Sequence, residues 1–593
     1  MIFGKHINRY YLRFLPLILL GLGSLVVVDY LQLTIPNLYQ MVINGMNDGK
    51  VLYNGVETTF DMVFLLEHIC APLLVIIACM VTGRFLWRVC FMGSAIMMET
   101  DMRKRMFSHC KDLSREYYQV NKVGNLMSLF TNDLENLQEC YGWGIMECFD
   151  ALFLGGLAIW KMYSMDPVLT AFCLIPMAFL MASSILVGNY MSAKWERRQE
   201  AFSDLSDFAQ ESYSGIAVIK AFVKEGKELW AFSKLNKENE KANIEFTRAS
   251  VMFRIMVMLF VESVTCVILG YGGYLVWKGS FNAGQLVEFI GYFDAIIWPI
   301  MAVADLIDMT SRGRASLKRV SELLDAKVDM VDRPDVKPLK DVKGSIEFRD
   351  LSFRYPDGEL NALHNVSFTI NAGENVGLVG KTGSGKTTLV DLILRTYNVP
   401  DGTVFVDGHD VNTVPIRDVR AACAYVPQDN FLFSDTIANN IGFGVSKKET
   451  AAIRQAARMA DVDSNIQEFQ QGYETILGER GVTVSGGQKQ RISIARALMK
   501  DAPILILDDS VSAVDTKTEK TILENLHETR AGKTTILIAH RISTIEKMDK
   551  ILFIDDGALV AMGPHEKLYE TCPDYRKMVD LQKLEEEGGN HNA

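Results

Sequence analysis

The sequence has few cysteines and no surplus of basic residues. Ten cysteines occur in 593 residues and none form a C-x-x-C pair, so neither a zinc ribbon nor a disulfide framework is supported. Acidic residues outnumber basic ones by 72 to 61, a formal net charge of −11. This balance argues against a surface that coats nucleic acid. With 44 glycines and 15 prolines, the chain is also unlike collagen or a disordered protein.

Long hydrophobic runs are nearly absent after residue 310 but frequent before it. A helix that crosses a bilayer needs roughly 20 residues. The runs of sufficient length are Phe14–Leu38, Ile69–Gly93, Gly144–Tyr163, Val168–Met191, Ile255–Trp277 and Gly284–Leu306. We therefore expect an all-α membrane domain with six spanning helices, in contact with membrane lipids.

Lysine and arginine are unevenly distributed between the connections. They precede the first run and cluster after the second and fourth runs, whereas the other connections contain few. Because basic residues are retained on the cytoplasmic side, we expect both termini in the cytoplasm, with the first run retained. The two basic connections show helical periodicity, so the membrane helices are expected to continue into the cytoplasm and to turn near residues 117–124 and 212–219.

The composition changes again beyond the last hydrophobic run. Residues 325–344 are charged and contain proline, which is typical of an exposed linker, and alternating strands begin at Ser345. The domain prediction is a transmembrane domain over 1–324, a linker over 325–344, an α/β nucleotide-binding domain over 345–583 and a polar tail over 584–593.

A phosphate-binding loop is predicted in this second half. Residues 380–387 read GKTGSGKT between an apolar strand and a helix, so backbone N–H groups and Lys386 can surround phosphates. The expected nucleotide contacts here are Gly380, Thr382, Gly383, Ser384, Gly385, Lys386, Thr387 and Thr388. The strand 504–508 ends in Asp508, which with Thr387 can hold magnesium. ATP and Mg²⁺ are the expected cofactors.

A further motif, Ser485-Gly486-Gly487-Gln488, resembles the signature of ATP-binding cassette (ABC) proteins. The whole chain is similar to a half-transporter of the exporter type, which implies a type I ABC exporter fold, a second half-transporter as partner, and two ATP molecules sandwiched between the cassettes. By this resemblance, Tyr355 stacks on adenine, Gln428 links magnesium and water to the membrane domain, and Asp515 and His540 are the D-loop and switch residues. The predicted tips are then coupling helices, and residues 478–481 form a cross-linking loop.

One residue departs from the family pattern. Hydrolysing members carry Glu after the magnesium-site Asp, as the base that polarises the attacking water, whereas this chain has Asp509. The shorter side chain predicts a site that binds ATP but hydrolyses it slowly. With Ser485 to Gln488 intact, this pattern resembles one subunit of the heterodimeric bacterial multidrug exporters that have one degenerate site. The resemblance implies a heterodimer in the bacterial cytoplasmic membrane whose partner carries the missing Glu and an altered signature; a slow homodimer is the alternative.

Charged residues inside the predicted spans are the candidate cargo contacts, because such charges usually face a cavity or each other. A salt-bridge cluster of Arg84 and Arg88 with Glu147 and Asp150 is one interpretation. An acidic cavity for amphipathic cations is the other, with Asp294 as its main determinant. The remaining candidate contacts are Glu262, Met256 and Trp298. We expect ATP-driven export of drugs or lipophilic compounds; the alternatives are a dedicated peptide, lipid or siderophore transporter and an ATP-gated membrane regulator.

Overall fold

The computed structural model describes residues 2–53, 56–478, 481, 484–512 and 514–590 and divides into two compact units. Unit 1 comprises Met1–Lys111 and Val123–Ala326, and unit 2 comprises Asp112–Lys122 and Lys327–Ala593. The short segment Asp112–Lys122 therefore belongs to the C-terminal unit, although it lies between two hydrophobic helices in the sequence. It overlaps residues 117–124, where the sequence predicts the first hairpin tip and, by the family resemblance, a coupling helix.

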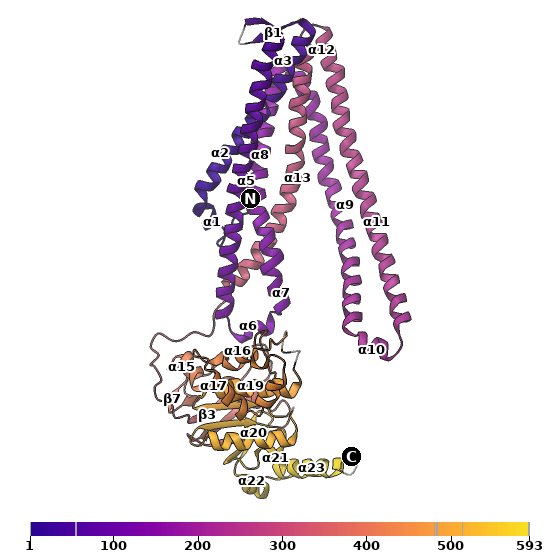
Figure 1. Cartoon of the computed structure of the whole chain (residues 1–593). Helices are drawn as coiled ribbons and strands as arrows, with labels where there is room; N and C mark the ends of the chain where they lie inside the picture. Colours follow the sequence, from indigo (N-terminus) through magenta and orange to yellow (C-terminus); the bar gives the residue numbers. More distant parts are fainter. Residues whose placement is uncertain (1, 54–55, 479–480, 482–483, 513, 591–593) are drawn as a thin grey trace. The chain divides into compact units, whose positions relative to one another are not determined.

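Unit 1 consists of long helices with a small β-hairpin. Its elements are α1 (Asn8–Arg13), α2 (Leu15–Gln32), α3 (Ile35–Asp48), β1 (Lys50–Tyr53), β2 (Val56–Thr59), α4 (Met62–Phe64), α5 (Ala71–Asp112), α7 (Val123–Ser128), α8 (Leu134–Met165), α9 (Pro167–Ser214), α10 (Ile216–Ala221), α11 (Glu225–Val267), α12 (Gly273–Trp277) and α13 (Ala283–Asp325). Single π-helical turns, Leu65–Cys70, Leu129–Asp133 and Ile268–Gly272, join several of them. Helix α8 packs along α13, and α9 packs along α11 (Figure 1).

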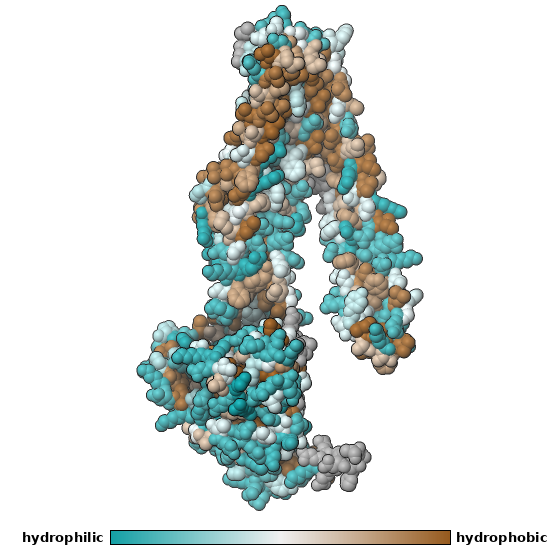
Figure 2. Space-filling view, in the orientation of Figure 1, coloured by the Kyte–Doolittle hydropathy of each residue, from teal (hydrophilic) through white to brown (hydrophobic). Residues whose placement is uncertain are grey.

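Five helical stretches in the described residues are long and apolar enough to cross a membrane: Leu15–Asp48, Met62–Asp112, Val123–Met165, Glu225–Trp277 and Ala283–Asp325. They contain five of the six runs expected from the sequence. The remaining run falls in α9, where the apolar described stretch, Pro167–Leu180, is shorter. Figure 2 shows hydrophobic residues gathered over the part of unit 1 that lies away from α7 and α10.

The helices are longer than the bilayer requires, as the periodicity of the basic connections predicts. Helix α9 runs for 48 residues and α11 for 43 before short helices or turns interrupt them. Helix α10 stands between them, at the position expected for the second hairpin tip. Near the N-terminus, the hydrophobic run is split into α2 and α3 because Pro36 has no N–H to continue the hydrogen-bond ladder.

Unit 2 is an α/β fold with two sheets. The six-stranded sheet has the order β12-β11-β5-β10-β9-β8, in which all neighbours are parallel except β12, and the four-stranded sheet has the antiparallel order β4-β3-β6-β7. The strands are β3 (Ile346–Phe353), β4 (Leu363–Ile370), β5 (Asn375–Val379), β6 (Val404–Val406), β7 (His409–Asp410), β8 (Cys423–Val426), β9 (Ile504–Asp508), β10 (Thr534–Ile538), β11 (Lys550–Asp555) and β12 (Ala558–Gly563).

The helices of unit 2 accompany these two sheets. They are α6 (Arg115–Val120), α14 (Lys386–Ile393), α15 (Ile416–Ala422), α16 (Ile437–Ile441), α17 (Thr450–Met459), α18 (Asp463–Glu468), α19 (Gly486–Lys500), α20 (Thr516–Thr529), α21 (Ile542–Ile545), α22 (His565–Thr571) and α23 (Pro573–Asn590). Helix α14 shares one hydrophobic core with strands of both sheets, so it is buried between them. Strands β9 and β10 are buried at every position, which is typical of central parallel strands.

Candidate functional site

The predicted nucleotide residues meet at one edge of the six-stranded sheet. The phosphate loop follows β5, Asp508 ends β9, Gln428 lies two residues after β8 and His540 two residues after β10. These four strands are adjacent and parallel in the order β5-β10-β9-β8. Their carboxyl ends therefore lie side by side, which is where open α/β sheets bind their ligands.

Two glycines of the loop are required by its geometry. A Cβ atom on Gly380 would lie 1.9 Å from the carbonyl oxygen of Ile554, which is too close for any side chain. Gly385 has a φ of +98°, and a Cβ there would come within 2.7 Å of the Leu363 side chain. The loop thus passes tightly between neighbouring strands before α14 begins at Lys386.

Lys386 is held inside this loop. Its Nζ donates hydrogen bonds to the carbonyl oxygens of Gly380 at 2.9 Å and Lys381 at 2.8 Å, and the side chain is buried. Burial lowers the pKa of Lys386, whereas Asp508 and Asp509 oppose this shift. The ammonium group is therefore placed at the centre of the loop, where it can bind the phosphates of a nucleotide.

Replacing Lys386 with Ala is expected to weaken ATP binding roughly 10- to 100-fold, because the loop loses its only buried charged donor to phosphate. The measurement is a titration of the full chain with a fluorescent ATP analogue. Lys381→Ala is the matched control, since this neighbouring lysine is 76% exposed and pairs with Asp555 at 2.9 Å. Equal losses in the two variants would contradict the assigned role of Lys386.

Asp508 and Thr387 form an oxygen-donor pair that suits magnesium. The Thr387 Oγ1 lies 3.4 Å from Oδ1 of Asp508, and the Tyr425 hydroxyl lies 3.5 Å from Oδ2. Burial raises the pKa of Asp508, and these two hydroxyl groups oppose the rise. A carboxylate and a hydroxyl at the phosphate loop are the hard ligands that Mg²⁺ prefers, so the residues present fit the ion.

Asp509 is fixed by its backbone rather than by its carboxylate. Its N–H donates to the Ile538 carbonyl at 3.0 Å, and its carbonyl accepts from the Gln490 side chain at 3.2 Å. The carboxylate lies 3.9 Å from Nε2 of His540. The structure therefore brings Asp509 and His540 together, as expected from the sequence.

Tyr355 follows strand β3, and its side chain lies against the first turn of α14, beside the phosphate loop. Its hydroxyl is 2.8 Å from Oγ1 of Thr388, and its ring contacts Phe353 and Tyr397 edge-on. Thr388, expected as a nucleotide contact, is buried and faces this tyrosine. Gln428 is exposed.

The signature segment begins a helix. Ser485 caps α19: its Oγ accepts the Gln488 N–H at 3.2 Å, and the Gln488 side chain accepts the Ser485 N–H at 3.0 Å. Gly486 is exposed and Gly487 is partly exposed at this helix N-terminus, which can bind an anion. Asp515 caps α20 through a single hydrogen bond, which its Oδ1 accepts from the Thr518 N–H. Residues 479 and 480 of the expected cross-linking loop lie outside the described residues.

Sequence reasoning missed the partner of Asp391 in α14. Oδ1 of Asp391 accepts a hydrogen bond from Arg115 of α6 at 2.7 Å, and the Asp391 side chain is only 4% exposed. The sequence feature that could have indicated a charged partner is the single carboxylate of Asp391 within the apolar sequence Leu-Val-Asp-Leu-Ile. An ionised side chain buried at such a position needs a partner.

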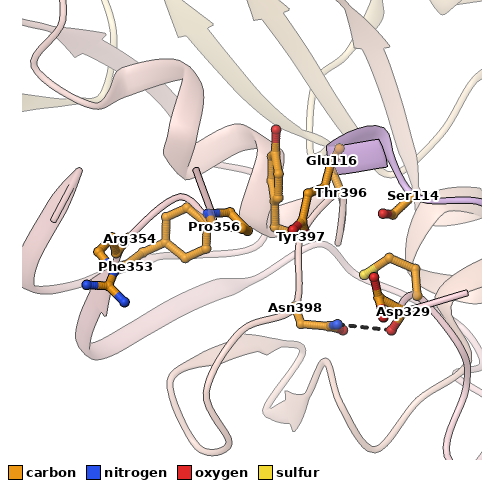
Figure 3. Close-up of a pocket in the computed structure, with 10 residues that line it drawn as sticks. Ser114, Glu116, Asp329, Phe353, Arg354, Pro356, Thr396, Tyr397 and Asn398 are labelled. Carbon is orange, nitrogen blue, oxygen red and sulfur yellow. Dashed lines mark hydrogen bonds between the residues drawn. The ribbon is translucent and has the colours of Figure 1, made fainter. Parts of the chain in front are cut away.

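A cavity of about 450 Å³ lies beside this contact (Figure 3). Ser114 and Glu116 border it together with Tyr397 and Asn398 of the nucleotide-binding domain, and the Asn398 amide donates to the Asp329 carbonyl at 3.0 Å. Segment 112–122 is thus packed against residues that directly follow α14.

The salt-bridge cluster that one interpretation places between the second and third hydrophobic runs is present only in part, because Arg84 acts electrostatically on Asp150 but no ion pair joins them among the described residues. Among the described residues, neither Arg84 nor Arg88 forms an ion pair with an acid: Arg84 bonds the Gln32 side chain at 3.3 Å, and Arg88 stacks on Trp87. The Asp150 carboxylate instead accepts the indole N–H of Trp298 at 2.8 Å. In an apolar environment, pairing a carboxylate with a neutral donor costs less desolvation free energy than burying a second charge beside it.

The other cargo candidates divide into exposed and packed residues. Asp294 and Glu262 are exposed and close enough to interact electrostatically, while Glu147 is buried. Met256 packs against the hydrophobic core of unit 1. The structure therefore does not gather all of these candidates into one site.

Comparisons with known proteins agree with this architecture. Residues 18–300 match the ABC transporter transmembrane region and residues 363–512 the ABC transporter family. The chain is 35% identical over 596 residues to the "Probable multidrug resistance ABC transporter ATP-binding/permease protein YheI" of Bacillus subtilis, covering 99% of this chain and 98% of that protein. It is 33% identical over 566 residues to the multidrug resistance-like ATP-binding protein MdlA of Escherichia coli, covering 95% and 94%.

A solved structure of a bacterial Atm1-family ABC exporter with ATP bound has the same fold. Its TM-score is 0.77 at 24% identity, and the match covers 98% of this chain and 100% of that chain. The fold is that of a type I ABC exporter, in which a helical membrane domain is fused to an ABC nucleotide-binding domain. The chain belongs to the ABC transporter family, as an ATP-binding multi-pass exporter.

Proposed function

We propose that this chain is the hydrolysis-poor subunit of a heterodimeric exporter that moves drugs and other lipophilic, amphipathic cations out of the bacterial cytoplasmic membrane. ATP drives the switch between inward- and outward-facing states, and both termini lie in the cytoplasm. The observation that carries the proposal is the combination of Asp509 with an intact signature at Ser485 to Gln488.

The asymmetry follows from how composite sites are assembled. Each site joins the phosphate loop of one chain to the signature of the other, so the signature helix α19 completes a site on the partner. That partner supplies Glu as the catalytic base, while the site on this chain binds ATP and hydrolyses it slowly. If the partner's signature is altered, ATP hydrolysis at the site on this chain becomes slower still.

The nucleotide roles rest on the geometry of the sheet edge. Lys386 and the loop N–H groups bind the phosphates, Thr387, Asp508 and Gln428 hold Mg²⁺, and His540 contacts the terminal phosphate. Bound magnesium would neutralise charge on the phosphates; the protein side chains orient the nucleotide. Tyr355 and Asp515 complete the site from the adenine side and from the partner side.

The preference for cations rests on the exposed acids of unit 1. Asp294 and Glu262 lie on neighbouring helices and are both exposed, whereas no basic side chain pairs with either among the described residues. A hydrocarbon-facing carboxylate is costly, so this face borders water or another chain. A lipophilic cation is the cargo that this charge attracts.

A dedicated lipid transporter is the second candidate. The chain is 34% identical over 503 residues to an ATP-dependent lipid A-core flippase of Syntrophus aciditrophicus, covering 84% and 82%. Peptide or siderophore transport, a homodimer, and an ATP-gated regulator are further alternatives that the same experiment separates.

The test uses inside-out vesicles that contain the chain with its partner. ATP-dependent uptake of tetraphenylphosphonium supports the proposal, and uptake of a lipid, peptide or siderophore probe alone supports a dedicated transporter of that cargo. Uptake of none of these probes supports a regulator. Robust cargo-stimulated hydrolysis by the purified chain alone would contradict the heterodimer.

Asp294→Asn is expected to lower tetraphenylphosphonium uptake roughly fivefold, the equivalent of about 1 kcal/mol from one exposed charge pair. Uptake of a neutral lipophilic dye should not change. The control is Asp308→Asn on the same helix, because the Asp308 side chain is exposed and pairs with Arg312. Unchanged cation uptake in Asp294→Asn would exclude this carboxylate as the determinant.

A further inference from the structure

Two carboxyl groups meet inside the helices of unit 1, and among the described residues neither forms an ion pair with a basic side chain, although Arg84 acts on both electrostatically. Asp29 of α2 and Asp150 of α8 lie within hydrogen-bonding range of each other, and they are 2% and 8% exposed. Two ionised carboxylates at this separation repel strongly in an apolar medium. The pair is therefore stable only with an added positive charge between or beside its oxygens.

Arg84 supplies only part of that charge, because it forms no hydrogen bond or ion pair with either acid among the described residues. Oδ2 of Asp29 and Oε2 of Glu147 are buried without a hydrogen-bond partner among the described residues. The other charged groups that face the cluster are Asp305 of α13 and Arg84 of α5, and Arg84 forms its hydrogen bond with Gln32 rather than with either acid. The cluster thus holds more acidic than basic groups.

The missing charge is best supplied by a proton. Among the described residues, no group of three or more His, Cys, Asp or Glu side chains is arranged to hold a metal ion. A proton shared by Asp29 and Asp150 removes one charge and turns one carboxyl group into a donor. It requires no further ligands.

Trp298 links this buried pair to an exposed surface. Its indole N–H is bound by Asp150, while the side chain remains 45% exposed. Asp294 lies one helical turn away on α13 and is also exposed, so both residues share one face. A ring held by its N–H edge presents its π face, which attracts organic cations.

We propose that Asp29, Asp150 and Trp298 form one binding site for a single positive charge, which holds a proton when cargo is absent and exchanges it for the charged group of a lipophilic organic cation. This inference rests on the proposed function, because it assumes cationic cargo. The cation stacks on Trp298, the Asp29–Asp150 pair loses its proton to water, and the net charge of the site is conserved.

The test measures tetraphenylphosphonium binding to the full chain in lipid nanodiscs from about pH 5 to about pH 9. This probe carries a permanent charge, so only the protein titrates. If one proton leaves for each cation bound, the dissociation constant of tetraphenylphosphonium falls roughly tenfold for each unit by which the pH rises across the titration range of the Asp29–Asp150 pair. A pH-indicator dye in weakly buffered solution should report about one proton released per bound cation.

Variants locate the exchanging group. Asp150→Asn and Asp29→Asn should abolish both the pH slope and the proton release, and Trp298→Phe should weaken cation binding without changing the binding of neutral Nile red. Glu288→Gln is the matched control: this buried acid of α13 is held by Tyr292 at 2.7 Å and Asn37 at 3.2 Å, so the slope should persist.

The outcomes separate this inference from the proposed function. A pH slope that survives in Asp150→Asn, or wild-type binding without proton release, overturns the exchange site while export of cations stands. Wild-type proton release needs no variant, so misfolding of a variant does not obscure the result. If tetraphenylphosphonium is neither bound nor taken up, the cationic cargo and the exchange site both fail.

Discussion

In the complex with its partner, Asp509→Glu is expected to raise ATP hydrolysis at the site on this chain about 100-fold, because the added methylene moves the carboxylate to the distance that the attacking water requires. The structure explains why the shorter side chain cannot compensate. The backbone of Asp509 is fixed on both sides, by Ile538 and by Gln490, so it cannot advance toward the nucleotide. Phosphate release at saturating ATP is the measurement.

Two controls isolate the effect of side-chain length. Asp509→Asn keeps the length and removes the charge, so it should give no gain, and ATP binding should be equal in all three proteins. If Asp509→Glu binds ATP normally but hydrolyses it no faster, the site is limited by something other than the position of this carboxylate. The asymmetric assignment of the two composite sites would then lose its basis.

Arg115→Ala is expected to destabilise α14 by about 2 kcal/mol, because Asp391 is left buried without its charged partner. The expected loss of stability is moderate because the Arg115 side chain is half exposed, so water partly screens its charge. Hydrogen exchange of the α14 amides in the full chain is the measurement. Adding Asp391→Asn should recover most of the loss, since the unpaired charge is then absent.

The loss should depend on pH. Burial raises the pKa of Asp391, and the Arg115 guanidinium opposes that shift, so removing Arg115 raises the pKa further. A raised pKa in the folded state means that the contribution of Asp391 to stability is lost as the pH rises. Wild type and variant should therefore differ most at neutral pH and converge below about pH 4, where Asp391 is protonated in both.

A matched control is available in the same unit. Arg333 is about as exposed as Arg115 and pairs with Asp401 at 2.5 Å, but that carboxylate is exposed. Arg333→Ala should cost at most about 1 kcal/mol and show little dependence on pH. A similar loss in both variants would contradict the idea that burial of the acid decides the effect.

The nucleotide site could be predicted from the sequence because its chemistry is encoded in short segments. The phosphate loop needs Gly380 and Gly385 for close approach and a left-handed turn, and Asp508 follows a continuous apolar strand. Parallel strand order then brings these segments together, with Gln428 and His540 at the same edge. Each of these requirements involves neighbouring residues, so each can be recognised in a short stretch of the sequence.

The membrane charges could not be interpreted in the same way. Arg84 and Arg88 were expected to pair with Glu147 and Asp150, but helix rotation and packing directed them to Gln32 and Trp87 instead. Hydrophobic periodicity predicts that a helix exists; it does not state which neighbour each polar side chain meets. The Asp29–Asp150 pair, contributed by helices far apart in the chain, is visible only in three dimensions.

The sequence by itself determined the two chemical halves, the ATP-binding motifs and the departure at Asp509, because composition, strand period and motif spacing are properties of contiguous residues. Only the tertiary structure decided that Arg115 pairs with a carboxylate 276 residues away and that Trp298 joins a buried acid pair to an exposed face. Those partnerships arise from burial, which couples residues that share no local pattern.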